Sequence, residues 1–300
     1  MHVTRSNRLS RTRSTPAVLT TLPPVQLTVG DLVLDTAVSG PADGPVVLLL
    51  HGFPQTSHSW RLIAPGLAEA GYRVVAPDQR GYSPGGRPHG VEAYRLPALV
   101  DDALGVLDAI GAPTTHVVGH DWGAAVAWQL AARHPDRVRS LTAVSVPHPS
   151  AFIEALRTDP IQREKSSYMR DFARPGYDAE LLADDAARLR SFFSGAEQCV
   201  DVEHCLRLAR EPGALASWLA WYAAQRLADV EDTPRVGVRA LYVWSTDDMA
   251  LGETGARGTA AYVDGPYRFE VLDGVSHWIP EQAAPALLAL LLEHLGQTPG

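Results

Sequence analysis

Short apolar runs alternate with amphipathic stretches over the first half of the chain. The first run, VVLLL, is apolar throughout, as expected of a strand buried on both faces of a sheet. Strand-like runs lie at 46–50, 73–76, 115–118 and 139–146. Apolar residues between them recur at helical spacing, which predicts helices at 59–70, at 96–110 and up to residue 133. Ahead of these runs, two alternating segments around Gly30-Asp31 predict a β-hairpin.

The alternation stops at residue 147 and resumes near residue 236. The intervening residues have only helical patterns, at 179–193, 204–210 and 214–228. Strand-like runs return at 238–244 and 267–272, followed by a helical stretch at 284–295. This order predicts an α/β fold with a mostly parallel sheet and helices on both faces. It also predicts a helical cap (147–235) inserted into a core of residues 23–146 and 236–297, over the carboxyl edge of the sheet.

Composition and charge exclude several kinds of partner. The 300 residues carry a formal net charge of −8, which argues against nucleic acid. The first fifteen residues are basic and rich in Ser and Thr but lack the apolar centre of a secretory signal, so we expect residues 1–22 to form a disordered tail. The longest apolar run, 286–292, is too short to span a bilayer.

The two cysteines, Cys199 and Cys205, are too few for a disulfide framework or a metal site. We expect them to be reduced packing residues of a cytoplasmic protein. We expect neither a metal nor a cofactor. The pattern leaves the oligomeric state open, including a homodimer.

Asp121 is the residue with the most informative surroundings. It lies in Gly119-His120-Asp121-Trp122-Gly123, directly after a predicted strand and directly before a predicted helix. Small residues two positions on either side of a central residue are the signature of the nucleophile elbow, a tight turn that lifts one side chain above the sheet. Most such elbows carry serine. A carboxylate there can displace a leaving group from an sp³ carbon and form an alkyl ester, which favours epoxide opening or halide expulsion.

Hydrolysis of such an ester needs a base, and the two late strands supply candidates. Chains with this elbow place nucleophile, acid and histidine in that order. Asp248 and His277 each follow a late predicted strand. We expect Asp248, with Asp247 as the fallback, to orient His277, which takes a proton from water. The N–H groups of Phe53 and Trp122 are the expected oxyanion hole.

These segments resemble the epoxide hydrolases of the α/β-hydrolase superfamily. The similarity spans about residues 25–295 and is strongest in the elbow segment. It is also carried by His51-Gly52-Phe53-Pro54 with Trp60-Arg61, by the APDQRGYS segment at 76–83 and by Gly274-Val275-Ser276-His277-Trp278. The resemblance implies the α/β-hydrolase fold and a cis Phe53-Pro54 bond. It also implies a substrate pocket walled by Pro54, Trp122, Trp221 and Trp278.

Two tyrosines match the lid tyrosines of that group. The group's first tyrosine lies four residues before a Phe-x-x-Pro-Gly segment, as Tyr168 lies before Phe172. Its second belongs to a Trp-Tyr pair on a late lid helix, as Tyr222 does. The resemblance implies that both hydroxyls bind the epoxide oxygen and protonate the leaving alkoxide. The implied reaction is hydrolysis of an epoxide by water to a vicinal diol through an ester on Asp121. The chain departs from the group at Ser245, where Gly is usual, and at Ala223, where Arg is frequent.

Two other functions are compatible with these residues. A haloalkane or haloacid dehalogenase would share the Asp-His-Asp machinery. Those enzymes tend to carry Asn at the position of Phe53 or Arg at the position of Trp122, although the N–H of Trp122 could still hold a halide. A non-catalytic receptor would bind a small molecule in the lidded pocket but would not need the complete set of catalytic side chains. The identity of the epoxide and the stereoselectivity are open.

Overall fold

An eight-stranded sheet organises the computed structural model, which describes residues 24–296. The predicted tail therefore lies outside the described residues. The strand order is β1-β2-β4-β3-β5-β6-β7-β8. β2 runs antiparallel to both neighbours, and every other neighbouring pair is parallel. The strands are β1 (Val25–Val29), β2 (Leu32–Ser39), β3 (Val46–Leu50), β4 (Arg73–Pro77), β5 (Thr115–His120), β6 (Val138–Val144), β7 (Ala240–Asp247) and β8 (Tyr267–Ser276).

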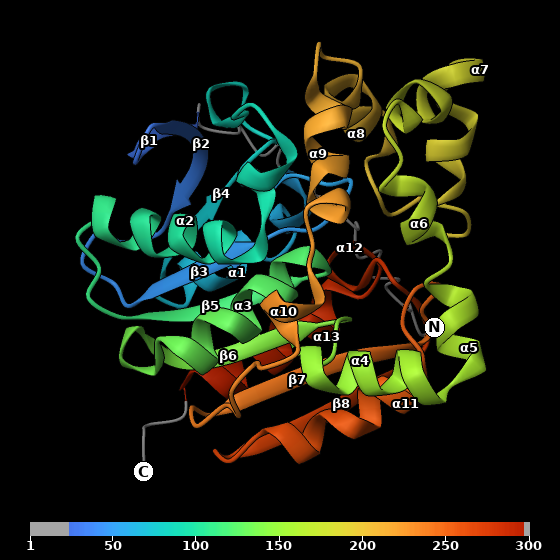
Figure 1. Cartoon of the computed structure of the whole chain (residues 1–300). Helices are drawn as coiled ribbons and strands as arrows, with labels where there is room; N and C mark the ends of the chain where they lie inside the picture. Colours follow the sequence, from blue (N-terminus) through green and yellow to red (C-terminus); the bar gives the residue numbers. More distant parts are fainter. Residues whose placement is uncertain (1–23, 297–300) are drawn as a thin grey trace, which may run out of the picture.

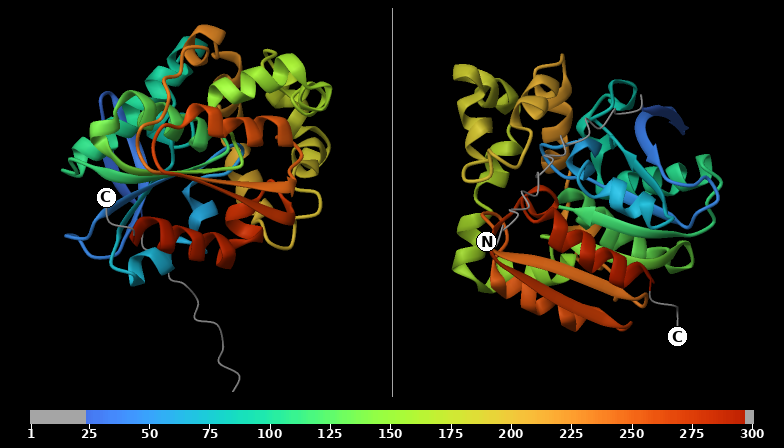
Figure 2. Two further views of the ribbon diagram at one scale, coloured as in Figure 1. Left: turned by 90° about the horizontal axis from the view of Figure 1, so that it is seen from below. Right: turned by 180° about the vertical axis from the view of Figure 1, so that it is seen from behind.

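The central strands are buried on both faces, as their apolar runs predicted. Every residue of β5 is buried, and β3 is buried after its first residue. One face of the sheet packs against α2 (Leu96–Ala109) and α3 (Trp122–Arg133). The other packs against α1 (Ala64–Glu69) and α13 (Ala284–Gly296). The left view of Figure 2 shows the sheet between α13, in red, and the green helices. The predicted α/β architecture is confirmed.

The chain between β6 and β7 folds into helices, as predicted. They gather at one side of the sheet, coloured yellow-green to light orange in Figure 1. Side chains of several of them line a cavity together with Asp121, which directly follows β5, so these inserted helices cover the carboxyl edge of the sheet. They are α4 (Pro149–Thr158), α5 (Pro160–Lys165), α6 (Tyr168–Phe172), α7 (Tyr177–Ser191), α8 (Val202–Ala209), α9 (Ala214–Ala223) and α10 (Leu227–Val230).

Short helices complete the connections. α11 (Glu253–Gly258) follows β7, and α12 (Ile279–Gln282) follows β8. The 3₁₀ helices are η1 (Ser57–Trp60), η2 (Pro84–Gly86), η3 (Val91–Tyr94), η4 (Pro135–Arg137) and η5 (Thr259–Tyr262).

Three helices are more interrupted than their apolar patterns predicted. The stretch at 59–70 divides into η1 and α1, because Pro65 has no N–H to bond to the preceding turn. α7 leaves the right-handed helical conformation at 183–186, where Asp184 and Asp185 have φ of 50° and 55°, values that Asp adopts more readily than most residues. The stretch at 214–228 divides into α9 and α10 around Arg226, which is extended.

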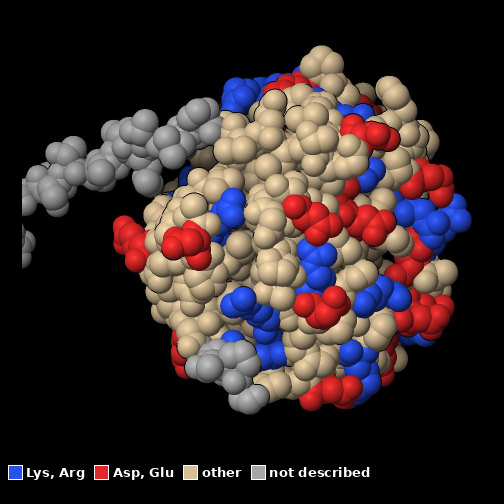
Figure 3. Space-filling model, turned by 90° about the vertical axis from the view of Figure 1, so that its left-hand side faces the viewer, with Lys and Arg blue, Asp and Glu red and all other residues tan. Residues whose placement is uncertain are grey.

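Charged side chains are spread over the surface rather than sorted by sign. On the face in Figure 3, basic and acidic side chains are interspersed, without the continuous basic surface that nucleic acids bind. Of the helices within residues 24–296, none is both long and apolar enough to cross a membrane. Cys199 and Cys205 are both free thiols.

Candidate active site

Asp121 occupies the tight turn between β5 and α3. Its φ of 53° and ψ of −123° are unusual for a residue with a side chain. The flanking glycines make the turn possible: a Cβ on Gly119 would lie 2.2 Å from the carbonyl oxygen of Gly123, and a Cβ on Gly123 would lie 2.1 Å from that of Leu50. The turn places Asp121 at the amino end of α3, where the helix dipole favours a negative charge.

The two oxygens of the Asp121 carboxylate have different partners. Oδ1 accepts a hydrogen bond from the backbone N–H of Phe53 at 2.7 Å. The backbone N–H of Trp122 also donates to the carboxylate. Oδ2 lies 3.5 Å from Nε2 of His277. The two N–H groups therefore meet at the carboxylate, while Oδ2 faces the imidazole.

Asp248 contacts the histidine, and its neighbour Asp247 does not. Nδ1 of His277 lies 2.9 Å from Oδ2 of Asp248. Oδ1 of Asp248 accepts hydrogen bonds from the N–H groups of Ala250 at 2.8 Å and Leu251 at 2.9 Å. Asp248 is fully buried, whereas Asp247 is exposed at the end of β7. Because backbone donors fix one oxygen of Asp248, the other can hold the imidazole with Nε2 directed toward Asp121.

Burial and the neighbouring charges shift the pKa values of His277 and Asp121 in opposite directions. Burial lowers the pKa of His277, but the charge of Asp248 and hydrogen bonds to Asp121 and Asp248 outweigh it and raise that pKa to about 10. Burial raises the pKa of Asp121, but the hydrogen bond and charge of His277 outweigh it and hold that pKa below its ordinary value. Near neutral pH, an anionic Asp121 therefore lies beside an imidazolium.

Two buried side chains that the sequence analysis did not select hold the backbone of His277. Nε2 of His120 lies 2.9 Å from the carbonyl oxygen of His277, and Oγ of Ser145 donates to the same oxygen at 3.2 Å. Burial lowers the pKa of His120 to about 4, so its ring is neutral near pH 7. The position of His120 inside the elbow motif was the one available sequence signal for this role.

The loop after β3 presents the N–H of Phe53. The Phe53-Pro54 bond is cis, as the resemblance implied. Nε2 of His51 accepts a hydrogen bond from the N–H of Gln79 at 3.1 Å, and the Gln79 amide donates to the carbonyl oxygen of His51 at 2.6 Å. Burial lowers the pKa of His51 to about 3, which keeps this ring neutral. His51 and Gln79 thus attach the loop to the segment after β4.

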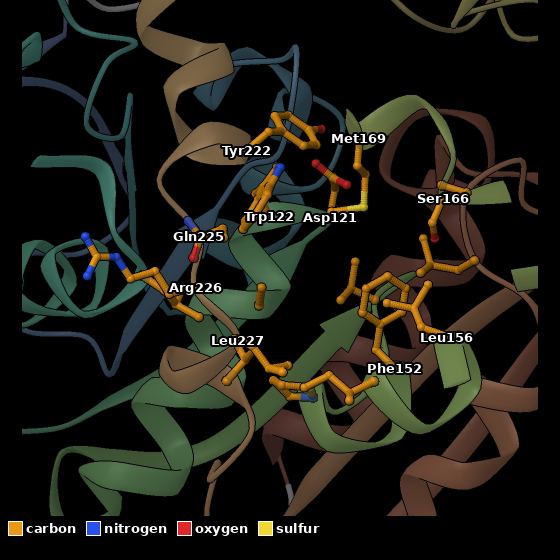
Figure 4. A pocket seen from close by; sticks show the side chains of 18 of the residues that line it. Asp121, Trp122, Phe152, Leu156, Ser166, Met169, Tyr222, Gln225, Arg226 and Leu227 are labelled. Carbon is orange, nitrogen blue, oxygen red and sulfur yellow. The ribbon is translucent and has the colours of Figure 1, made fainter. Parts of the chain in front are cut away.

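Tyr168 of α6 and Tyr222 of α9 line the same cavity as Asp121. Their ring centroids are 6.2 Å apart, with the ring planes 70° apart. Burial raises the pKa of both phenols, and the negative charge of Asp121 acts in the same direction. Both hydroxyls are therefore protonated near neutral pH and can donate. Figure 4 shows Tyr222 beside Asp121 and Trp122 at one end of the cavity.

Three of the four predicted wall residues line cavities that contain Asp121, namely Trp122, Pro54 and Trp278. Trp221 lines neither of these cavities, so the prediction for it was wrong. Its ring packs against that of Trp122 with centroids 5.8 Å apart, and its Nε1 donates to the carbonyl oxygen of Arg80 at 2.9 Å. Successive helical residues point about 100° apart, so a helix that directs Tyr222 toward Asp121 directs Trp221 elsewhere.

The comparisons with known proteins agree with this geometry. A family model described as alpha/beta hydrolase fold matches residues 45–284. The chain belongs to the α/β-hydrolase fold family. Epoxide hydrolase A of Mycobacterium tuberculosis (strain ATCC 25618 / H37Rv) is 33% identical, and the alignment covers 86% of this chain and 92% of that protein. The AB hydrolase superfamily protein YfhM of Bacillus subtilis (strain 168) is 34% identical, covering 88% and 94%.

Solved structures give the same result. One from a study of novel epoxide hydrolases of the alpha/beta hydrolases superfamily in metagenomes from hot environments matches with a TM-score of 0.84 and 28% identity. It covers 93% of this chain and 100% of that chain.

This α/β-hydrolase has a second polar cluster, between η1 and α8. His58, Asp201 and His204 each offer a potential metal-ligand atom, and these atoms lie within 4.8 Å of one another. The sequence analysis did not single out these residues. Nε2 of His58 lies 3.1 Å from Oδ2 of Asp201, and Arg207 lies within hydrogen-bond distance of Nδ1 of His204 at 3.1 Å. These contacts link η1 of the core to the inserted helix α8, and they explain the cluster without a metal ion.

Proposed function

We propose that this protein is an epoxide hydrolase that forms a vicinal diol through an ester on Asp121. The observation that carries the proposal is a single cavity lined by the Asp121 carboxylate and by two protonated phenols, Tyr168 and Tyr222. An alkoxide that leaves an opened epoxide is a strong base and needs a proton, which a phenol can supply. A departing halide needs none. Relatives and solved structures named epoxide hydrolases support the same function.

In the first half-reaction, the hydroxyls of Tyr168 and Tyr222 hydrogen-bond the epoxide oxygen. Oδ2 of Asp121 attacks a ring carbon from the opposite side, because Oδ1 is engaged by the N–H of Phe53. The C–O bond of the ring breaks, its electron pair goes to the oxygen, and that oxygen takes a proton from one phenol. The products are a hydroxyalkyl ester of Asp121 and a tyrosinate, with inversion at the attacked carbon.

Formation of the ester lowers the pKa of His277. The charge of Asp121 and its hydrogen bond are among the factors that raise the pKa of His277, so the pKa of His277 falls when Asp121 becomes a neutral ester. The tyrosinate is a strong base because burial raises the pKa of both phenols. The imidazolium proton therefore passes to the tyrosinate through water. This transfer restores the phenol and leaves His277 neutral.

In the second half-reaction, Nε2 of His277 takes a proton from water, and the resulting hydroxide attacks Cγ of Asp121. The N–H groups of Phe53 and Trp122 stabilise the tetrahedral oxyanion. When the ester bond breaks, the departing alkoxide takes the proton of the new carboxyl group. Asp121 returns as carboxylate and His277 as imidazolium, as in the free enzyme.

The same proposal assigns tasks to the two parts of the chain. Residues 23–146 and 236–297 form the core that supplies the nucleophile, the base and the oxyanion hole. Residues 147–235 act as the cap that supplies both tyrosines and much of the cavity wall. The cap also excludes bulk water from the reacting atoms.

A direct test measures diol and halide separately. The purified protein is incubated with racemic styrene oxide and, in parallel, with 1-bromobutane, and Asp121→Ala is the control. We expect diol well above the spontaneous rate with the parent protein only, and halide at background. Halide release faster than diol formation would favour a dehalogenase. Saturable binding without either product would favour a receptor.

A further inference from the structure

Asp121 lies between two spaces of unequal size. The larger, which we call the wide arm, has a volume of about 300 Å³. The smaller, which we call the narrow arm, has a volume of about 30 Å³. Asp121, Tyr168, Tyr222 and Ala250 line both arms, so the reacting groups stand where the two arms meet.

The wide arm suits an apolar group. Its wall is built mainly from aliphatic and aromatic side chains of the inserted helices, among them Phe152 and Leu156 of α4 and Leu227 of α10. Figure 4 shows these three side chains around the cavity, with Asp121 and Tyr222 at the far end. Leu227 is 54% exposed, so the wide arm reaches the surface. Its volume is at the low end of the range of small-molecule sites.

The narrow arm is bounded largely by packed aromatic rings. Phe53, Phe172 and Phe192 are among its lining residues, and the ring centroid of Phe172 lies 5.1 Å from that of Phe53 and 5.3 Å from that of Phe192. Trp278 also lines this arm, and its Nε1 donates to the carbonyl oxygen of Phe192 at 3.0 Å. The remaining space holds on the order of one or two water molecules and no alkyl chain or ring.

His277 lines the narrow arm and not the wide arm. The water that His277 activates must lie within hydrogen-bond reach of its Nε2. The narrow arm is therefore the space for that water. A substrate group that filled it would exclude the water and stop ester hydrolysis.

We propose that the substrates are terminal epoxides, with one bulky apolar substituent on one ring carbon and only hydrogens on the other. This inference rests on the proposed epoxide hydrolysis. The substituent occupies the wide arm, and the CH₂ carbon faces the narrow arm. Epoxides substituted on both carbons place a group against Phe192 and Trp278 and react slowly.

Two isomers with equal carbon number test this without a difference in overall hydrophobicity. The probes are 1,2-epoxyhexane and trans-3,4-epoxyhexane, and diol formation is measured under kcat/KM conditions. We expect the terminal isomer to react at least about tenfold faster. Lengthening a terminal epoxide from 1,2-epoxybutane to 1,2-epoxyhexane should raise kcat/KM about fourfold per methylene, as for transfer into an apolar site.

Matched variants test which residues of the two arms cause the preference for terminal epoxides. Met249 lines the narrow arm and is 43% exposed, so Met249→Ala enlarges that arm at the surface with little cost to the fold. It should raise the ratio of kcat/KM for the internal isomer to that for the terminal isomer, and Phe192→Ala should do the same. Leu156→Trp, which fills the wide arm, should instead remove most of the increase in kcat/KM with the chain length of terminal epoxides.

The outcomes separate this inference from the function beneath it. If no epoxide gives diol, the proposed function fails. If the internal isomer reacts as fast as the terminal isomer, or if the variants leave the ratio unchanged, epoxide hydrolysis stands and the terminal preference is overturned. A terminal preference that weakens in both narrow-arm variants supports it.

Discussion

In the proposed mechanism, the carboxylate of Asp121 first attacks as an anion and then, as an ester, must be open to water. Its surroundings divide these tasks between its two oxygens. The N–H of Phe53 holds Oδ1 at 2.7 Å, and Oδ2, the proposed attacking oxygen, lies 3.5 Å from Nε2 of His277. In the proposed second half-reaction, the same N–H group is in place to stabilise the oxyanion.

Removal of the base should separate the two half-reactions. His277→Gln should permit alkylation but stop ester hydrolysis, because the base acts only in the second step. After addition of a racemic epoxide, intact-mass measurement should find one epoxide added per chain. Asp121→Ala, as control, should form no adduct. Turnover of His277→Gln at the parent rate would show that the base is misassigned.

The tyrosines should act in the first half-reaction only. Tyr168→Phe and Tyr222→Phe should each slow alkylation by about 10²–10³-fold, the usual effect of losing one hydrogen bond to a developing charge. The double variant should nearly stop alkylation. Hydrolysis of an ester already formed should change little, which rapid-quench single turnovers can measure. A double variant that opens epoxides at the parent rate would remove the tyrosines from the mechanism.

The two half-reactions should differ in pH dependence. The pKa of Asp121 is held below its ordinary value, so Asp121 stays anionic and the tyrosines stay protonated near neutral pH. The alkylation rate should therefore be nearly constant from about pH 5 to about pH 9, between the ordinary pKa values of a carboxyl and a phenol. Ester hydrolysis needs neutral His277. Its rate should rise with pH through a midpoint below the value of about 10 that applies when Asp121 is charged. Rapid-quench rates across pH test both statements, and alkylation that titrates near the ordinary pKa of histidine would contradict the first.

At the scale of elements, the elbow depends on contact between backbones. A Cβ on Gly123 would lie 2.1 Å from the carbonyl oxygen of Leu50, so α3 and β3 would have to move apart. Gly123→Ala should therefore lower the free energy of unfolding by about 1–3 kcal/mol or more and displace Asp121. Gly237→Ala is the matched control, because a Cβ there meets nothing within 4 Å. Equal thermal stability and activity of the two variants would count against the tight elbow.

The sequence predicted the elements that depend on local patterns. The strands follow from apolar runs, and the cis bond and the Asp248–His277 contact follow from motif positions. Trp221 was misplaced because a Trp-Tyr pair does not specify which helical residue faces the cavity. The bonds from His120 and Ser145 to the carbonyl oxygen of His277 join residues 157 and 132 positions apart, so no local pattern encodes them.

At the scale of the whole molecule, ion pairs join the segment before α2 to residues 211–229, in the last part of the inserted region. Arg87 pairs with Glu211 at 2.8 Å, Arg226 with Glu92 at 2.6 Å, and Arg95 with Asp229. Asp229 is the most buried of these carboxylates and lies in α10, whose Leu227 lines the wide arm. The arm's shape therefore depends on how these parts dock, which the sequence does not reveal.

Loss of the Arg95–Asp229 ion pair should lower the free energy of unfolding measurably. Asp229→Ala removes a largely buried carboxylate and its hydrogen bonds to Arg95, and should lower the free energy of unfolding in thermal or denaturant unfolding by more than the loss of an exposed pair does. Glu253→Ala removes an exposed i,i+4 pair with Arg257 and should change it by less than about 0.5 kcal/mol. An Asp229→Ala variant as stable as Glu253→Ala would contradict the proposed role of this docking contact.

The central claim is that Asp121 forms an ester whose Cγ is attacked by water, and a single turnover in water labelled with heavy oxygen (¹⁸O) tests it most directly. With enzyme in excess over epoxide, the oxygen added to the substrate comes from Oδ2 of Asp121, and the label enters the protein. We predict an unlabelled diol and one ¹⁸O in the peptide that contains Asp121. A labelled diol with unlabelled Asp121 would show that water attacks the epoxide directly, and would contradict the account.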